Sequence, residues 1–211
     1  PSITVDDADG GRQAAEHLLE LGHRRFAIIT DRLSEPFAGA GPRIARPEEA
    51  EQTFFVTQRR FAGYRMALEA AGLRWNDVPI AECADNSEAD GGRSMRVLLA
   101  GGPPPTAVLC VTDRLALGAM AAAQAAGLSV PADLSFVGFD DIPAAATAEP
   151  GLTTIRQAHR EKGLRAGEAL VALLNDPAQV RAQRLPVELV VRGSTGPAPQ
   201  ESAKPGAPAR S

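Results

Sequence analysis

Side chains that accept hydrogen bonds follow five apolar segments of the sequence, at the point where each segment ends. They carry carboxylate, amide or hydroxyl groups: Asp6-Asp7, Asp31, Asp85-Asn86, Thr112-Asp113 and Asp140-Asp141. In a desolvated cleft, hydrogen bonds to charged acceptors contribute about 1.5–3 kcal/mol each. With an arginine to complement them, these acceptors predict a site for a polyhydroxylated or nitrogen-rich small molecule.

The same residue types also cap helices, and this alternative applies to several of them. Asp or Asn before a helix accepts hydrogen bonds from its first backbone N–H groups and contributes about 1 kcal/mol. We interpret Asp113 as such a cap. Asp6 and Asp140 are each followed by a second acid that could cap instead, so both roles stay open for them. Arg60 stands beside Arg59 in a predicted first helical turn, where the residues alone favour a solvated surface arginine.

The sequence contains no pattern that pairs a nucleophile with a base. It has no GxSxG, phosphate-binding loop or HExxH motif. His17, His23 and His159 lack the spacing of metal ligands, so no metal, cofactor or enzymatic activity is predicted. Cys83 and Cys110 lie inside apolar runs and not in a CxxC, which is typical of small buried residues in a reducing compartment.

Two hydrophobic periods alternate along the chain and define the elements that position these residues. Short apolar runs predict buried strands at 3–5, 26–29, 78–81, 107–111 and 134–139. Apolar residues at three- and four-residue spacing predict helices at 11–21, 58–71, 87–101 and 113–127. This alternation is typical of an open, doubly wound α/β fold, a parallel sheet with helices on both faces. Ligands bind at the carboxyl edge of such sheets, where the polar residues above are expected to meet.

Two segments do not follow these periods. Residues 32–57 are rich in Pro and Gly and predict a long loop, either a lid carrying Phe37, Phe54 and Phe55 or a disordered insertion. Residues 196–211 lack apolar residues to bury and predict a disordered tail.

Composition limits the possible partners. The chain has 211 residues, with 26 acidic and 22 basic side chains, and a formal net charge of -4. An acidic balance argues against nucleic-acid binding by this chain alone. The longest weakly polar stretch, 115–130, is too short to span a bilayer, so no membrane contact is expected. Because the sequence begins at Pro1 without a signal-peptide pattern, we expect a fragment.

A series of motifs in a fixed order resembles the LacI/GalR family of bacterial transcriptional regulators. They are His17-Leu18 with Gly22-His23-Arg24, Arg60 to Tyr64, Pro105 to Val108, Thr112-Asp113 with Ala116 to Ala119, Val130 to Ser135, Gly138 to Asp141, Leu152 to Gln157, and Arg192 to Thr195. Each motif is weak by itself, but their order and spacing are specific. The resemblance is to the effector-binding region, which has a type I periplasmic-binding-protein-like fold.

The resemblance implies a domain organisation in which two lobes clamp an effector below a helix-turn-helix domain. The effector-binding region would be 1–195, with 6–156 and 185–195 in the C-terminal lobe, 157–184 crossing to a mostly absent N-terminal lobe, and 196–211 as the tail. Apolar residues of the crossing helix at 158–175 would then lack a partner: Leu164, Leu170, Leu173 and Leu174.

The resemblance also implies which residues contact the effector. By motif position these are Asp6, Arg60, Asn86, Thr112, Asp140 and Gln157. Asn86 stands where relatives often have an aromatic residue, and Thr112 where many have asparagine, so the set of hydrogen bonds must differ here. The helix at 115–126 is expected either to pack within its own lobe or to meet a second copy near Leu117 and Met120.

We therefore predict the effector-sensing and dimerising region of a cytoplasmic LacI-type regulator. Its partners would be a small molecule, usually a carbohydrate in this family, a second copy of the chain, and operator DNA through the missing domain. One alternative is a periplasmic sugar-binding protein of a transport system. A second is an enzyme that uses the acidic edge as general acid and base.

Overall fold

A computed structural model describes residues 2–33, 41–49, 54–175 and 181–200. Its strands form two sheets. The strands are β1 (Ile3–Val5), β2 (Phe26–Thr30), β3 (Arg43–Ala45), β4 (Ile80–Glu82), β5 (Ala107–Cys110), β6 (Ser135–Asp140), β7 (Thr153–Gln157), β8 (Gln183–Leu185) and β9 (Val187–Val190). The larger sheet has the order β3-β4-β2-β5-β6-β7-β9, and β1 pairs with β8 in the smaller one.

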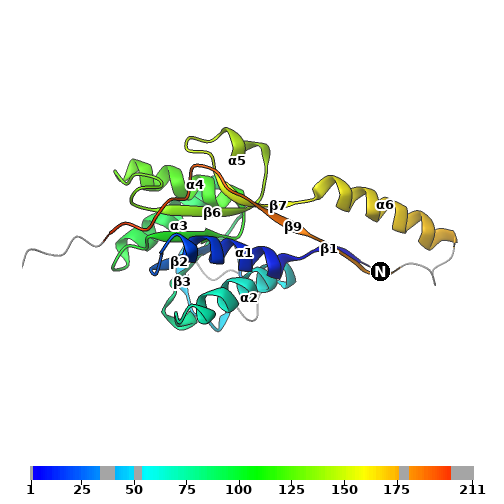
Figure 1. The fold of residues 1–211 in the computed structure, drawn as a ribbon, viewed down its shortest axis with the longest axis horizontal. Helices are drawn as coiled ribbons and strands as arrows, with labels where there is room; N and C mark the ends of the chain where they lie inside the picture. The colour runs from blue at the N-terminus through cyan, green and yellow to red at the C-terminus, as the bar shows by residue number, and fades with distance from the viewer. Residues whose placement is uncertain (1, 34–40, 50–53, 176–180, 201–211) are drawn as a thin grey trace, which may run out of the picture.

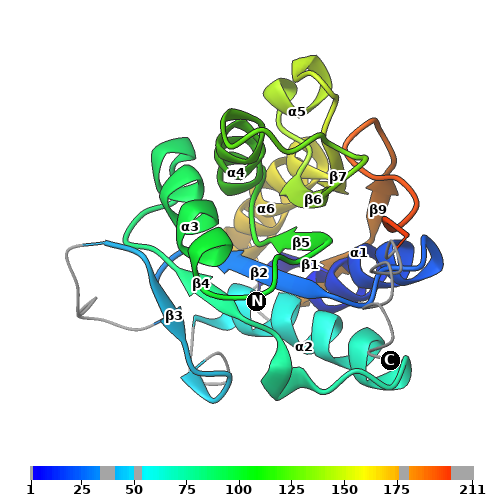
Figure 2. The ribbon, with the colours of Figure 1, turned by 90° about the vertical axis from the view of Figure 1, so that its left-hand side faces the viewer.

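Helices cover both faces of the larger sheet, with α1 and α2 on one face and α3 and α4 on the other (Figure 2). The helical segments are α1 (Asp7–Glu20), α2 (Phe55–Ala70), the 3-10 turn η2 (Trp75–Asp77), α3 (Glu88–Ala100), α4 (Asp113–Ala125), α5 (Pro143–Thr147) and α6 (His159–Asn175). Helix α6 projects away from this body beside β1 and β9 (Figure 1). The doubly wound α/β prediction is confirmed.

The sheet differs from the prediction at its edges. Strands β4, β2, β5, β6 and β7 run parallel, whereas β3 and β9 pair antiparallel with β4 and β7. Strand β1 lies outside this sheet, so the prediction that all five polar segments end strands of one sheet is wrong for Asp6. The three residues of β1 carry no signal that distinguishes pairing with β2 from pairing with β8.

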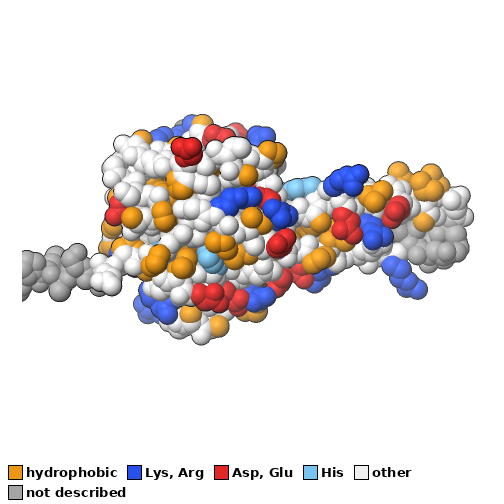
Figure 3. All heavy atoms as spheres, turned by 45° about the horizontal axis from the view of Figure 1, so that its top comes forward, with side chains coloured by type: hydrophobic (Ala, Val, Ile, Leu, Met, Phe, Trp, Pro, Cys, Tyr) orange, Lys and Arg blue, Asp and Glu red, His pale blue; other side chains and the backbone are white. Residues whose placement is uncertain are grey.

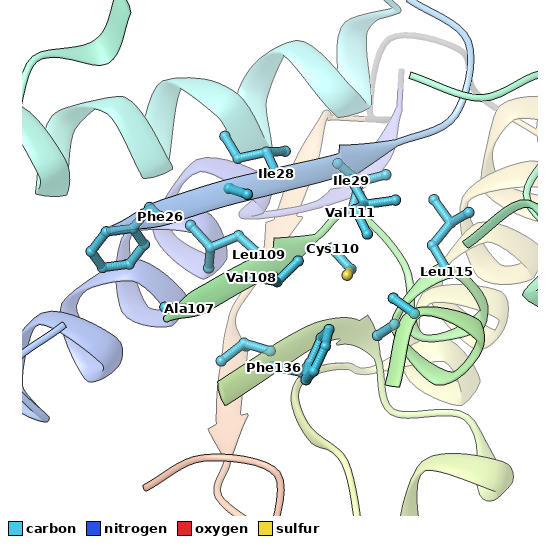
Figure 4. Close-up of a cluster of buried hydrophobic side chains, with 14 of the residues drawn as sticks. Phe26, Ile28, Ile29, Ala107, Val108, Leu109, Cys110, Val111, Leu115 and Phe136 are labelled. Carbon is cyan, nitrogen blue, oxygen red and sulfur yellow. The ribbon is translucent and has the colours of Figure 1, made fainter. Parts of the chain in front are cut away.

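The core lies between the central strands and the helices on either side. Ile28, Leu109 and Phe136, from β2, β5 and β6, are all 0% exposed (Figure 4). Helix α4 packs against α3, and its Met120 is buried within the body. Met120 therefore packs within its own lobe, as one of the two alternatives expected. Leu117 is half-buried.

The two irregular segments contain more structure than their composition indicated. Within residues 32–57, β3 adds an edge strand and α2 begins at Phe55. Phe54 and Phe55 are exposed, while Phe37 lies outside the described residues. At the other end of the chain, the backbone N–H of Gly196 donates to Ser135 Oγ and that of Ala198 donates to the carbonyl of Leu21. Gly196 and Ala198 therefore contact the body, so the predicted disordered tail does not begin at 196, and residues 201–211 lie outside the described residues.

Candidate functional site

Polar residues gather along the carboxyl edge of the parallel strands, the edge from which β7 leads into α6. Asn86 follows β4, Asp31 follows β2 and Thr112 follows β5. Asp140 and Gln157 are the last residues of β6 and β7. The strand register thus brings residues that are far apart in sequence to one edge, as the doubly wound pattern predicts.

Arg60 lies at the centre of this edge and is buried, at 6% exposure. Its Nε donates to Asp7 Oδ1 at 2.9 Å, and its Nη1 donates to the carbonyl of Val111. Its Nη2 lies 3.8 Å from Asp140 Oδ1, and its Cζ lies 3.7 Å from the centroid of the Phe139 ring. The interpretation of Arg60 as a solvated surface arginine is therefore wrong. A buried guanidinium requires such partners, because an unpaired charge is costly to desolvate.

The close approach of α1 and α2 is what places Arg60 next to Asp7. A side chain at Gly63 would overlap the carbonyl of Ala8, and one at Gly11 would overlap the carbonyl of Arg60. Glycine at both contact points therefore lets the helix backbones meet. Gly63 lies within the Arg60 to Tyr64 motif, whereas the contact between Arg60 and Asp7 joins residues 53 positions apart, so local spacing did not predict it.

Asp140 lies in an unusual turn that directs its carboxylate into this cluster. Its φ is 125°, and that of Asp141 is 55°, a region that side-chain-bearing residues rarely adopt. Gln157 Nε2 donates to Asp140 Oδ1 at 2.5 Å. Burial raises the pKa of Asp140, and the positive charge of Arg60 opposes this effect. Such strain at a polar, partly buried position is typical of functional sites.

Asn86 and Thr112 form a second pair on the same edge. Thr112 Oγ1 donates to Asn86 Oδ1 at 2.6 Å and also accepts from the backbone N–H of Leu115, which makes Thr112 the N-cap of α4. The residue before Thr112 is Val111, whose carbonyl accepts from Arg60. The Asn86–Thr112 pair is therefore linked to Arg60 through the two residues that follow β5, Val111 and Thr112.

Asp113 does not cap α4, so that interpretation is wrong. It is 0% exposed, and its carboxylate accepts from Thr154 Oγ1 at 2.5 Å and from the backbone N–H of Ile142 at 2.9 Å. Burial raises the pKa of Asp113 to about 6, against the effect of these hydrogen bonds. This buried carboxylate connects the start of α4 to the residues after β6 and to β7.

Asp6 caps α1, although Asp7 was expected to be able to take that role. Asp6 Oδ1 accepts from the backbone N–H of Asp9 at 3.2 Å. The Asp6 carboxylate also lies 3.8 Å from Arg59 Nη2 and 3.6 Å from Arg184 Nη1. The structure thus brings Arg60, Asp140 and Gln157 into one cluster, whereas Asp6 lies beside it in a separate set of contacts.

Asp31 is a further residue of the edge that motif matching missed, although its place after a strand was a signal. Burial raises the pKa of Asp31, and the nearby Arg60 opposes this effect. Next to the edge, a pocket of about 590 Å³ is lined by residues that include Asp141, Gln157 and His159. The surface between β6 and the start of α6 is thus hollowed and polar.

The described residues offer little for covalent or metal chemistry. No three His, Cys, Asp or Glu side chains among them are arranged to hold a metal ion. Burial raises the pKa of the Cys83 thiol to about 12, and that of Cys110 also lies well above its usual value. Thiols with such pKa values are poor nucleophiles. Within the described part of the chain, no helix is long and apolar enough to cross a membrane.

Comparison with known proteins agrees with this architecture. Residues 15–195 match the periplasmic binding protein-like domain family. An HTH-type transcriptional regulator of Mycolicibacterium smegmatis is 37% identical over 171 residues, which are 80% of this chain and 46% of that protein. The chain belongs to the periplasmic binding protein-like family, in the form found in LacI-type regulators.

Solved structures show the same relationship for this LacI-type domain. A LacI family transcriptional regulator from Enterococcus faecium with bound ribose has a TM-score of 0.77 and 28% identity over 92% of this chain and 65% of that one. The dimeric Lac repressor with an 11-residue C-terminal deletion has a TM-score of 0.76 and 34% identity, covering 94% of this chain and 65% of that one. The chain spans about half the length of the curated relatives it matches.

Proposed function

We propose that this chain is the effector-sensing part of a LacI-type transcriptional regulator and binds a carbohydrate at the carboxyl edge of its sheet. The observation that carries this proposal is the cluster of Arg60, Asp140 and Gln157 at the end of parallel strands in a domain of this family. The Nη2 of Arg60 and Oδ1 of Asp140 are 3.8 Å apart, too far for a direct hydrogen bond. A ligand hydroxyl could accept from the first and donate to the second.

The remaining contacts of the effector follow from the same edge. Asn86 and Thr112 supply an amide and a hydroxyl on one side, and Asp6 supplies a carboxylate beside Arg59. Residues 6–156 and 185–195 would form one lobe of a clamp, and 157–184 would cross to the other. Closure of the two lobes on the effector would change operator affinity through differential binding to the open and closed states.

The assembly and location follow from this role. Relatives include a repressor described as dimeric, and we propose a homodimer that contacts operator DNA through a helix-turn-helix domain in the cytoplasm. The chain itself would have no enzymatic activity, because its edge holds acceptors and a paired arginine without an activated nucleophile. Hydrolysis of a bound sugar that is abolished by Asp140→Asn would instead support the enzyme alternative.

Isothermal titration calorimetry on the full-length protein tests the proposal. The ligands are ribose, glucose and cellobiose, and we expect at least one to bind. Asp140→Asn preserves the shape of the turn but removes the charge, and should weaken binding about 10- to 150-fold, the value of one charge-assisted hydrogen bond. Asp133→Asn, in an exposed carboxylate that contacts only the backbone N–H of Ser129 in the described structure, is the matched control.

Two results would contradict the proposal. Unchanged affinity in Asp140→Asn would remove Asp140 from the site. A secretory signal in place of a helix-turn-helix in the upstream sequence would favour the periplasmic binding protein, which shares the fold but serves transport.

A further inference from the structure

The turn after β6 contains two consecutive strained residues, and the second of them is held on both sides. Asp140 and Asp141 have φ angles of 125° and 55°. Arg192 Nη2 lies 2.6 Å from Asp141 Oδ1, and Arg156 Nε donates to Asp141 Oδ2 at 2.6 Å. Each oxygen of the Asp141 carboxylate therefore has its own guanidinium partner.

The two arginines of this contact are themselves held in place, Arg192 by a backbone carbonyl and Arg156 by its position on β7. Arg192 Nη1 donates to the carbonyl of Leu152 at 2.8 Å, and the side chains of Arg192 and Asp141 are only 18% and 11% exposed. Burial would raise the pKa of Asp141, but hydrogen bonds to Arg192 and Arg156 outweigh it and lower the pKa. The carboxylate is thus charged and held in one orientation.

The same contacts join the candidate site to the strands that lead to the projecting part of the molecule. Arg156 on β7 stands opposite Asp140 on β6 and opposite Glu188 on β9, whose carboxylate lies 3.5 Å from its Nη1. Strand β7 continues into α6, and β9 continues from β8, which pairs with β1 (Figure 1). A shift of β7 relative to β9 would therefore displace the two arginines that hold the Asp141 carboxylate.

We propose that Asp141 is a positioning residue for effector binding: clamped by Arg156 and Arg192, it holds the turn in which Asp140 faces Arg60 and Gln157. This inference rests on the proposed function, in which Asp140 contacts the effector. Without the clamp, the turn relaxes from its strained conformation and the Asp140 carboxylate leaves the cluster. The clamp also ties the orientation of Asp140 to β7, which leads into α6, and to the residues that follow β9.

Three substitutions at position 141 separate the clamp from the backbone conformation. Asp141→Asn tolerates a positive φ and keeps one oxygen for an arginine, so it should lose the least affinity. Asp141→Gly tolerates the same φ but has no clamp, and should weaken binding about tenfold, the effect of losing a charge-assisted contact. Asp141→Ala lacks both features and should lose the most. Asp77→Ala removes an exposed ion pair with Arg74 before β4, at the opposite edge, and is the matched control.

Two readouts on the full-length protein test the proposal. Crystal structures of Asp141→Gly and Asp141→Ala should show the Asp140 carboxylate displaced from Gln157 Nε2. Calorimetry with ribose, glucose and cellobiose should show the affinity losses above at unchanged fold by circular dichroism. In an Asp140→Asn background, Asp141→Gly should have little further effect, because both changes act through the same carboxylate.

The outcomes distinguish this proposal from the function on which it rests. Wild-type affinity in Asp141→Gly, or an undisplaced Asp140 in its structure, would overturn the positioning role. Additive losses in the double variant would overturn it as well, since a merely structural residue gives that result. If the wild-type protein binds none of the sugars, the proposed carbohydrate function fails, and the crystal structures alone then decide the role of Asp141.

Discussion

Helices α4 and α6 differ in environment although both are long and carry regularly spaced apolar residues. In α4, Leu115, Ala116 and Ala119 are all 0% exposed, because α3 and the sheet cover them. In α6 no residue is buried, and Leu174 is 80% exposed. Apolar side chains show on the surface of the projecting part in Figure 3.

This difference shows that an amphipathic pattern forms a helix but does not supply the surface that buries it. The described residues packed beside α6 are those of β1, and Ile3 lines a small pocket with Leu170 and Leu173. Exposed apolar faces of this kind mark contact surfaces. Leu164, Leu170 and Leu174 are exposed, as expected of side chains with little to pack against, and Leu173 is half-buried.

The largest expected effect lies in the covered body. Phe136 on β6 is 0% exposed (Figure 4), and Phe136→Ala should lower the free energy of unfolding by about 3–5 kcal/mol, through lost burial and the cavity that remains. Urea denaturation followed by circular dichroism measures it. A loss below about 1 kcal/mol would mean that the neighbouring side chains fill the cavity and that burial of Phe136 contributes little to stability.

An intermediate effect depends on pH and again concerns the body. His23 is 0% exposed and contacts Thr106, Ser135 and Gly196; burial lowers its pKa, and the carbonyl of Gly196 opposes this effect. Below about pH 6.5 the unfolded chain protonates this histidine and the folded chain resists protonation, so the contribution of His23 to stability falls as the pH falls. Urea denaturation at a series of pH values between 7 and 5 measures this contribution.

Substitution identifies which histidine is responsible. His23→Gln should remove most of this dependence. His17 is half-buried beside Thr195, and burial also lowers its pKa, so His17→Gln is the matched control and should leave the His23 contribution in place. A pH dependence as large in His23→Gln as in the unchanged protein would assign it to other groups.

The smallest expected effect lies on α6. Leu170→Gln with Leu174→Gln should change the free energy of unfolding of the 211-residue chain by no more than about 0.5 kcal/mol, because both side chains are already in water. In the full-length protein, where we expect a second lobe to cover them, the same pair should cost roughly 2 kcal/mol or more. Equal effects in both proteins would contradict a covered α6.

The local sequence determined most of the elements and the edge where the polar residues meet. Apolar periods predicted four of the five parallel strands, near 26–29, 78–81, 107–111 and 134–139, together with the helices between them, whereas β7 (Thr153–Gln157) was not predicted. Ser87 caps α3 by accepting from the backbone N–H of Asp90. These features depend on residues close together in the chain. The short edge strands β3 and β9 carry no distinctive pattern, and β1 pairs with β8 near the other end of the chain, so the local sequence did not predict these pairings.

The sequence alone determined which side chains stand at strand ends, because the hydrophobic periods of strands and helices depend only on residues that are close together in the chain. Tertiary structure decided what each of these side chains does. Arg60 is buried because Gly63 lets α2 approach α1, and there it pairs with Asp7. Asp6 caps α1, and the buried Asp113 accepts hydrogen bonds from β7 and from the residues after β6. Burial and ion pairing are set by distances between elements, and those distances exist only after the helices pack on the sheet.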